Sequence, residues 1–211
     1  LVDDIVYIKN ASAGFAGGNV TAEGTFSIKD NSYSGHAVLK NIQCGQLQEY
    51  VGGLSGKLSG NIDFTGILGN NNSIKLYGSV SIDDAIYNEI AINKIDAAVS
   101  MQGKNVQVSA LTISLADGGN IAAAGKITGS SLDLEFYGSN IDLSLLKNYT
   151  SILLSGTADF YGHLSGSINN PYLDLKLVAY DGQVMGQPYH DMRISAAGSM
   201  DGVKIEKMTM Q

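Results

Sequence analysis

Apolar and polar residues alternate along much of this chain. From Val20 to Ile28 the even positions are apolar or small, and the odd positions are polar. Successive side chains of a β-strand point to opposite faces of a sheet, so this period of two predicts a strand with one apolar and one polar face. The same alternation recurs in stretches that begin at Leu58, Ile74, Leu132, Leu154 and Leu173. We therefore expect an all-β protein.

Residues typical of tight turns separate these stretches, at intervals of about 8–12 residues. They are Asp30-Asn31, Asn70 to Asn72, Asp83-Asp84, Gln102-Gly103, Asp117 to Gly119, Asn169 to Pro171, Asp181-Gly182 and Asp201-Gly202. Strands that follow one another through tight turns pair in antiparallel fashion. The pattern therefore predicts a repetitive antiparallel meander.

One stretch departs from the period of two. Leu143, Leu146, Tyr149 and Leu153 follow a helical spacing, and Asp142 before them is a suitable N-cap residue. We predict a short helix at about 142–151. The corresponding stretch earlier in the chain, from Gln46 to Val51, predicts a single helical turn. Both precede a strand that begins with Leu-Ser-Gly, so we expect them to cap one end of the sheet.

Three sequence markers recur in the same order. GGNVTAEG from Gly17 returns as GGNIAAAG from Gly118, LSGNIDFTG from Leu58 as LSGTADFYG from Leu154, and KIDAAVSM from Lys94 as RISAAGSM from Arg193. The offsets are 118 − 17 = 101, 154 − 58 = 96 and 193 − 94 = 99. We expect a tail of a preceding repeat at 1–16, repeat unit 1 at 17–117 and repeat unit 2 at 118–211, as part of a longer array. Chance similarity among glycine- and serine-rich strands is the alternative.

Composition supports a β protein and excludes some partners. Among 211 residues there are 26 glycines and only 2 prolines, and tryptophan is absent. The net charge is −7 and no cluster of basic residues exists, so a nucleic-acid partner is disfavoured. The single cysteine, Cys44, cannot form an internal disulfide. No apolar run is long enough to span a membrane, so we expect any anchor outside this sequence.

An apolar face that runs along the whole meander must be covered. A second sheet would cover it in a sandwich, whereas a sheet that coils along its length would leave an apolar groove. Several glycines fall at the apolar positions of the alternation. They favour the groove, because glycine permits sharp coiling or the close approach of a ligand. These glycines are Gly24, Gly60, Gly66, Gly78, Gly125, Gly138, Gly156 and Gly162.

The large residues of the same parity are the candidate binding residues, because they would line such a groove and contact acyl chains. They are Val20, Phe26, Leu58, Ile62, Phe64, Leu68, Leu76, Val80, Ile121, Ile127, Leu132, Leu134, Phe136, Leu154, Phe160, Leu164, Leu173, Leu175 and Leu177.

Catalytic and metal-binding chemistry has little support. His36, His163 and His190 are dispersed, with no second histidine or cysteine at ligand spacing, so we expect no metal site and no cofactor. Asp159 and His163 share the polar face of one strand but lack a nucleophile in any recognised pattern. We therefore expect a solvated polar face, no catalytic residue and no enzyme.

Several motifs of the second unit resemble the TamB/AsmA-like superfamily. They are the predicted helix at Leu143 to Leu146, the strand with Leu154, Gly156, Gly162 and Gly166, Asn170-Pro171, Asp181-Gly182, and Gly186 to Tyr189. The strands at Gly17 and Gly118 are similar too. The motifs consist mostly of glycine, asparagine and apolar positions. The first unit departs from them, with Asn70 to Ser73 where the second has Asn170-Pro171.

The resemblance implies a periplasmic β-groove in a protein that is anchored in the inner membrane of a diderm bacterium and reaches the outer membrane. It implies phospholipid as the cargo, moved between the two membranes, and an outer-membrane barrel as a further partner. Two other functions stay open. One is a scaffold that assists outer-membrane protein insertion by β-augmentation, and the other is a structural or adhesive surface repeat.

Overall fold

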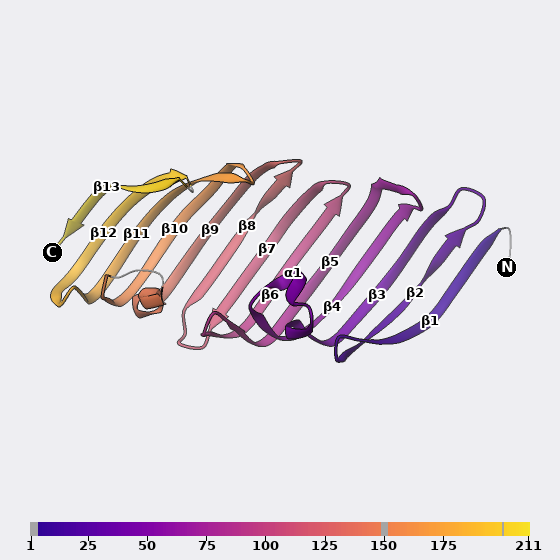
Figure 1. Ribbon diagram of the computed structural model, residues 1–211, viewed down its shortest axis with the longest axis horizontal. Helices are drawn as coiled ribbons and strands as arrows, with labels where there is room; N and C mark the ends of the chain where they lie inside the picture. Colours follow the sequence, from indigo (N-terminus) through magenta and orange to yellow (C-terminus); the bar gives the residue numbers. More distant parts are fainter. Residues whose placement is uncertain (1–3, 149–151, 200) are drawn as a thin grey trace. The chain divides into compact units, whose positions relative to one another are not determined.

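The computed structural model describes residues 4–148, 152–199 and 201–211. In these ranges thirteen antiparallel strands follow one another in sequence order in one open sheet (Figure 1). The strands are β1 (Ile5–Phe15), β2 (Gly18–Ser27), β3 (Ser32–Gln43), β4 (Leu54–Ile67), β5 (Asn70–Tyr87), β6 (Ile90–Gln102), β7 (Asn105–Leu115), β8 (Asn120–Thr128), β9 (Ser131–Asp142), β10 (Leu154–Ser167), β11 (Asn170–Val184), β12 (Gln187–Ser199) and β13 (Gly202–Met210). The predicted all-β, repetitive antiparallel fold is confirmed.

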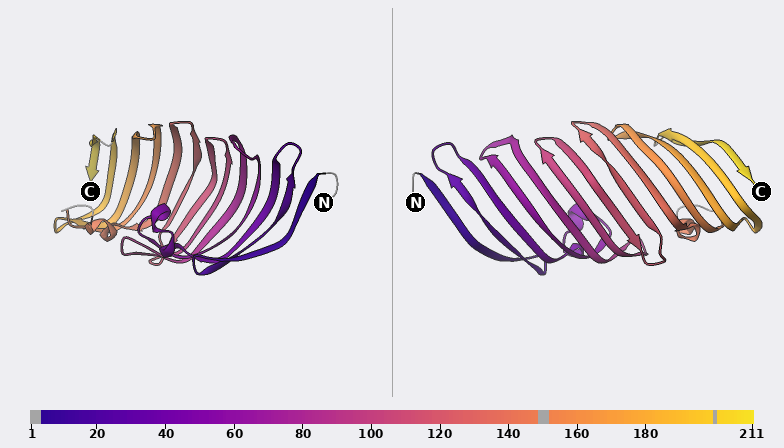
Figure 2. Two further views of the ribbon diagram at one scale, coloured as in Figure 1. Left: turned by 45° about the vertical axis from the view of Figure 1, so that its right-hand side comes forward. Right: turned by 180° about the vertical axis from the view of Figure 1, so that it is seen from behind.

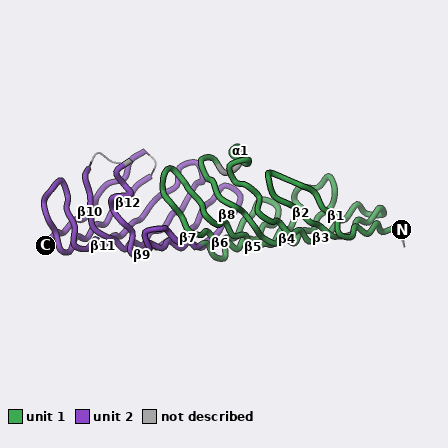
Figure 3. The backbone as a smooth tube through the Cα atoms, turned by 90° about the horizontal axis from the view of Figure 1, so that it is seen from below, with its two compact units in different colours: residues 1–111 green, residues 112–211 purple. Residues whose placement is uncertain are grey.

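The chain divides into two compact units, residues 1–111 and residues 112–211 (Figure 3). The division falls inside β7, whereas the repeat boundary predicted at 117/118 falls in the turn after β7. The predicted repeat boundaries stay a prediction. Within each unit, successive strands pair along most of their length and bend as they run (Figure 2).

Backbone geometry also relates the two units. β4 begins at Leu54 and β10 at Leu154, and both strands have 14 residues. The third residue of each is a glycine with positive φ, Gly56 at 126° and Gly156 at 105°, and the pairing register shifts at that point in both. The offset is 154 − 54 = 100, so by strand start Leu154 corresponds to Leu54, whereas the sequence marker matches Leu154 to Leu58 at an offset of 96. Leu-Ser-Gly occurs twice within β4, at Leu54 and at Leu58, so each alignment matches one copy.

A set of asparagine and aspartate residues bends alternate strands. They have positive φ within a strand: Asn10 (54°) in β1, Asn41 (55°) in β3, Asp84 (52°) in β5, Asn140 (53°) in β9 and Asp181 (41°) in β11. Asn and Asp tolerate this left-handed conformation better than other non-glycine residues. At Asn10, Asn41 and Asn140 the pairing register also shifts, which is the mark of a β-bulge, and bulges bend strands.

Two of the turns predicted from the sequence, at Asp83-Asp84 and at Asp181-Gly182, are wrong. Asp83-Asp84 lies inside β5, and Asp181-Gly182 lies inside β11, whose turn comes later at Met185-Gly186. The signal was ambiguous because a tight turn and a bulge both need a residue that accepts positive φ.

Polar side chains of the neighbouring strand satisfy backbone groups at the bulges. The Asn41 N–H donates to Ser59 Oγ at 3.1 Å, and the Asn140 N–H donates to Asp159 Oδ1 at 2.8 Å. Asp159 is therefore more than a solvated residue of the polar face, because its carboxylate replaces a ladder hydrogen bond that the bulge removes.

Helical segments join β3 to β4 and β9 to β10. In unit 1 they are η1 (Cys44–Gln46) and α1 (Gln48–Val51), and in unit 2 the segment is η2 (Leu143–Asn148). The helix predicted at 142–151 is thus a shorter 3-10 helix, and its last residues, 149–151, lie outside the described residues. Asp142 caps η2 as expected, since its Oδ1 accepts the Ser144 N–H at 2.8 Å. The α-helical turn instead belongs to unit 1.

The buried core of unit 2 lies where η2 meets the sheet. Leu143 of η2 packs with four residues of three strands, Ala158, Ala179, Tyr189 and Met192. The Tyr189 hydroxyl donates to the Ser155 carbonyl at 2.7 Å. In unit 1, Cys44 of η1 and Ile42 of β3 just before it are fully buried. η1 and η2 therefore each pack at one end of the apolar face, where the sequence predicted a cap.

The bulge at Asn140 gives a stability prediction. Asn140→Ala should lower the free energy of unfolding by about 1 kcal/mol, because alanine is strained at a φ of 53°. Asn140→Gly should keep most of the stability, since glycine adopts this conformation freely. Urea unfolding measures both, with Ser139→Ala, an exposed neighbour without positive φ, as the control. Equal losses in Asn140→Ala and Ser139→Ala would mean that the bulge conformation is not strained.

Candidate functional site

Strand register places the candidate residues on one face. In unit 2, three rows of directly paired residues cross the sheet. They are Gly125–Leu134–Leu164–Leu173–Gly198, Ala123–Phe136–Gly162–Leu175–Ala196 and Ile121–Gly138–Phe160–Leu177–Ile194. Directly paired residues of neighbouring strands lie on the same face. No polar or charged residue interrupts these rows, so the face is continuously apolar over β8 to β12.

Unit 1 has an equivalent face. Its rows are Val20–Leu39–Gly60–Val80–Ala97, Ala22–Ala37–Ile62–Gly78–Val99 and Gly24–Gly35–Phe64–Leu76–Met101. A further row, Ile42–Leu58–Ile82–Ile95, runs beside the helical segment. The strand register therefore places on one face the same alternate residues that the sequence pattern assigned to the apolar face.

Most of the candidate residues are only half-buried. Among the nineteen, Leu132 is buried, and Leu68 lies in the turn after β4 with 67% of its surface exposed. All the others are intermediate. A strand face that packs against a second sheet would instead bury its large side chains almost fully. Contact of these residues with lipid stays a prediction.

Aromatic rings lie over glycines of the neighbouring strand in both units. In unit 1, Phe64 on β4 lies over Gly35 on β3, and Tyr33 on β3 lies over Gly66 on β4. A Cβ atom at Gly35 would be only 2.6 Å from Phe64 Cζ. The two rings contact each other, with centroids 6.2 Å apart. We call these four residues the unit 1 aromatic–glycine square.

Unit 2 contains the same arrangement, the unit 2 aromatic–glycine square. Phe160 on β10 lies over Gly138 on β9, and Phe136 on β9 lies over Gly162 on β10. The ring centroids are 5.9 Å apart, with the rings edge to face. A Cβ atom at Gly138 or Gly162 would collide with the ring above it. The sequence interpretation of these glycines as room for a ligand was therefore incomplete, because a ring already fills the space directly above them.

The pattern behind the squares is visible in the sequence but was missed. Each participating strand carries an aromatic residue, any residue and a glycine: Tyr33-Ser34-Gly35, Phe64-Thr65-Gly66, Phe136-Tyr137-Gly138 and Phe160-Tyr161-Gly162. Two antiparallel strands with this triplet can each place a ring over the glycine of the other. The sequence assigned Phe64, Gly66, Phe136, Gly138, Phe160 and Gly162 to the apolar face but did not include Tyr33 and Gly35. Alternation alone also does not determine which residues of neighbouring strands are paired.

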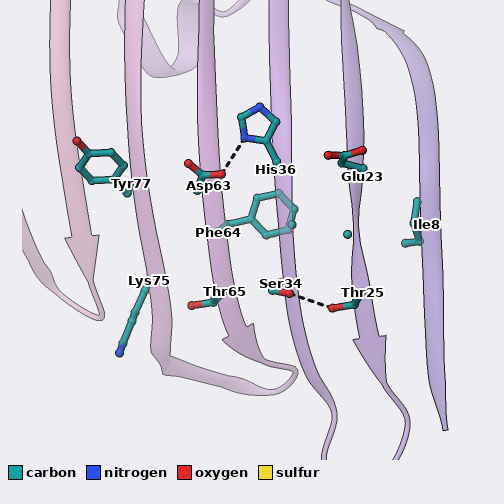
Figure 4. Close-up of a pocket in the computed structure, with 12 residues that line it drawn as sticks. Ile8, Glu23, Thr25, Ser34, His36, Asp63, Phe64, Thr65, Lys75 and Tyr77 are labelled. Carbon is teal, nitrogen blue, oxygen red and sulfur yellow. Dashed lines mark hydrogen bonds and ion pairs between the residues drawn. The ribbon is translucent and has the colours of Figure 1, made fainter. Parts of the chain in front are cut away.

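The opposite face of unit 1 carries a shallow hollow of about 580 Å³ over β1 to β5 (Figure 4). Two polar rows supply most of its lining, Glu23–His36–Asp63–Tyr77 and Thr25–Ser34–Thr65–Lys75. The His36 ring nitrogen Nδ1 lies 2.8 Å from Asp63 Oδ1, and the hydroxyls of Thr25 and Ser34 are 2.9 Å apart. Four of the eight polar residues in these two rows thus bond to one another across the strands.

Each of the three histidines pairs with an aspartate of a neighbouring strand. The pairs are His36 with Asp63, His163 with Asp133 and His190 with Asp181, each at 2.8 Å. The hydrogen bond from His163 holds the pKa of the Asp133 carboxyl below its usual value, with a smaller contribution from Lys126. Pairs as exposed as these contribute little to stability.

The structure separates Asp159 from His163. Asp159 accepts the Asn140 N–H and the Tyr180 hydroxyl, whereas His163 bonds to Asp133. In the described ranges no polar or charged residue is buried, and no three side chains of the kinds that bind metals lie together. Burial raises the pKa of the Cys44 thiol. The most distinctive surface of both units is therefore the apolar face.

Comparisons with known proteins do not assign the chain to a family. No family model matches it, and neither a curated protein nor a solved structure matches it. The resemblance to the TamB/AsmA-like superfamily therefore stays a prediction. Among the residues that the structure describes, no helix is both long and apolar enough to cross a membrane.

The Asp133–His163 pair gives a prediction on pKa. His163→Ala should raise the pKa of the Asp133 carboxyl toward its usual value, because its largest source of stabilisation as an anion is removed. The lowered pKa favours folding above the ordinary aspartate range, and this contribution fades as the pH falls through the folded pKa. Carboxyl ¹³C NMR titration measures the shift.

Asp191 provides the control for this titration. Its pKa is lowered by Arg193 and not by a histidine, so it should not move in the His163→Ala variant. Equal shifts at Asp133 and Asp191 would indicate a general change of the sheet and contradict a specific His163 effect.

Proposed function

We propose that this chain is a segment of a conduit that shields lipid acyl chains on the apolar face of its sheet. In this function phospholipid moves between the inner and outer membranes of a diderm bacterium, through the periplasm. The observation that carries the proposal is the uninterrupted, half-exposed apolar face of each unit.

The amount of exposed surface supports an uncovered face. The solvent-accessible surface is 12966 Å² for a mass of 22.2 kDa. Two separate compact proteins of half this mass would together expose only about 11,300 Å². The solvent-accessible surface of this chain is larger than that value, as expected for units that lack a second layer over their apolar face.

Acyl chains match such a face in energy and dimensions. Exposure of a methylene to water costs about 0.8 kcal/mol, so a 16-carbon chain faces a cost of about 12 kcal/mol without cover. A row across the five strands β8 to β12 spans about 19 Å at a strand spacing of about 4.8 Å. The rows offer apolar contact throughout and no polar group that would fix one ligand in place.

The two alternative functions draw less support from this geometry. β-Augmentation requires a free strand edge. Among the described strands only β1 and β13 have an unpaired edge, whereas β2 to β12 have paired neighbours on both sides. A structural or adhesive repeat has no need for an apolar face that is left half-exposed. Both remain as outcomes of the experiment that follows.

A photo-crosslinking experiment tests the proposal in cells that produce the full protein. A crosslinker in place of Phe160 or Phe64 should capture phospholipid, because both side chains belong to the apolar face. A crosslinker in place of Tyr161 or Thr65, the next residue on the same strand, should capture none, since these side chains point to the opposite face. Mass spectrometry of the crosslinked product identifies the ligand. Capture of protein alone at all four positions would favour a scaffold and overturn the lipid function.

A charge substitution tests transport itself. Phe160→Arg should lower lipid capture at least tenfold while the chain stays folded, because a charge beside hydrocarbon costs about 3 kcal/mol. Tyr161→Arg, on the polar face, is the matched control and should leave capture unchanged. In a closed sandwich, Phe160→Arg would unfold the domain instead. Unfolding of this variant, together with no lipid capture by the wild type, would show that no open apolar face exists.

A further inference from the structure

We infer that the two aromatic–glycine squares set the depth of the acyl-chain path, and that their glycines keep this path open by letting the rings lie low against the sheet. This inference rests on the proposed function. It assigns a role to Gly66, Gly138 and Gly162, and to the rings above them, that neither core packing nor turn formation explains.

The squares lie outside the covered core. In unit 2 the buried cluster consists of Leu143, Ala158, Ala179, Tyr189 and Met192, beneath and beside η2. Phe136 and Phe160 are only half-buried, although each fills the space over a glycine of the neighbouring strand. The rings therefore have one side against the sheet and the other available to a ligand.

Gly138 and Gly162 make room for an aromatic ring of the neighbouring strand. They are not required for two backbones to come close together. At Gly138 an added Cβ would meet three atoms of the Phe160 ring, and at Gly162 three atoms of the Phe136 ring. At Gly24 or Gly60, by contrast, it would meet the backbone of the adjacent strand. Neither Gly138 nor Gly162 has a positive φ, so alanine fits their backbone conformation.

The consequence of an added methyl group differs accordingly. At Gly24 or Gly60 it forces two strands apart. At Gly138 or Gly162 it forces a ring to move, and the sheet beneath the ring favours movement outward. The ring then occupies the space in which the proposed acyl path lies. Gly35 is less suitable for a test, because its Cβ would also crowd the Glu23 carbonyl oxygen at 2.7 Å.

The recurrence of the square supports a functional role. Both squares join the two strands that flank a helical segment, β3 with β4 and β9 with β10. Measured from the bulge, however, the squares differ in position. Phe160 is next to Asp159, which binds the bulge at Asn140, whereas Phe64 is five residues beyond Ser59, which binds the bulge at Asn41. The square is thus retained although its distance from the bulge is not.

The test uses the purified chain and a phospholipid with one fluorescent acyl chain, with binding measured by fluorescence. Gly138→Ala and Gly162→Ala should each weaken binding at least fivefold, with circular dichroism and the unfolding midpoint close to wild type. Gly45→Ala is the control, because an added Cβ there meets nothing within 4 Å. It should leave binding unchanged.

Compensating double variants make the test specific to the rings. Leucine in place of the phenylalanine removes the ring tip that the new methyl group displaces. Gly162→Ala combined with Phe136→Leu, and Gly138→Ala combined with Phe160→Leu, should therefore restore most of the binding. Phe136→Leu and Phe160→Leu alone are the references, and each double variant should bind as its leucine single variant does, because the added methyl group no longer meets a ring.

The outcomes separate this inference from the proposed function. Failure of the wild-type chain to bind the lipid would contradict the proposed function itself. Wild-type binding that is unchanged in Gly138→Ala and Gly162→Ala would overturn the role of the squares, and so would a loss that the double variants do not restore. If Gly162→Ala does not fold, Phe136→Trp replaces it as the test. A larger ring over Gly162 should also weaken lipid binding.

Discussion

The antiparallel register of one-sided strands is the constraint on which the other features depend. Because each strand alternates apolar and polar residues, a shift of one residue in any pair would exchange the two faces. The observed registers instead align Leu134 with Leu164 and Leu164 with Leu173, and on the opposite face Glu135 with His163. A continuous apolar surface therefore arises from many separate pairings. The bulges, the helical segments and the aromatic–glycine squares each modify this surface at defined positions.

The bulges and the helical segments divide the apolar face of a unit into two parts. Near η2 the residues are almost fully buried, as Ala158 and Ala179 are, whereas Leu164 and Leu173 toward the other end of the strands are half-exposed. Asn140 marks the transition on β9, and Asp159 satisfies the backbone group that the bulge leaves free. The covered part supplies the stability of a small core, and the uncovered part remains available for contact with a ligand.

The sequence predicted the strands and their faces because period-two alternation is a local property. It predicted the cap at Asp142 for the same reason. It misassigned Asp181-Gly182, since a turn and a bulge require the same left-handed conformation and only the partner strand distinguishes them. It also missed the pairing of Phe160 with Gly138, because a contact between strands depends on register, which alternation alone leaves undetermined. The errors of the sequence prediction therefore lie at positions where pairing with the neighbouring strand decides between two conformations that the local sequence allows equally.

A surface that moves a ligand differs physically from one that stores it. A storage site gains from a deep pocket with a few fixed polar contacts, whereas movement requires that neighbouring positions bind with similar free energy, because any deep minimum slows release. The apolar rows meet this requirement in that their side chains offer only hydrophobic contacts and no hydrogen-bonding group that would create a deep minimum. Rings that stood upright from the sheet would interrupt these rows, and glycines opposite them allow large aromatic side chains without such obstacles. On the proposed function, the abundance of glycine on the apolar face thus follows from the need for an even surface as much as from the bending of the strands.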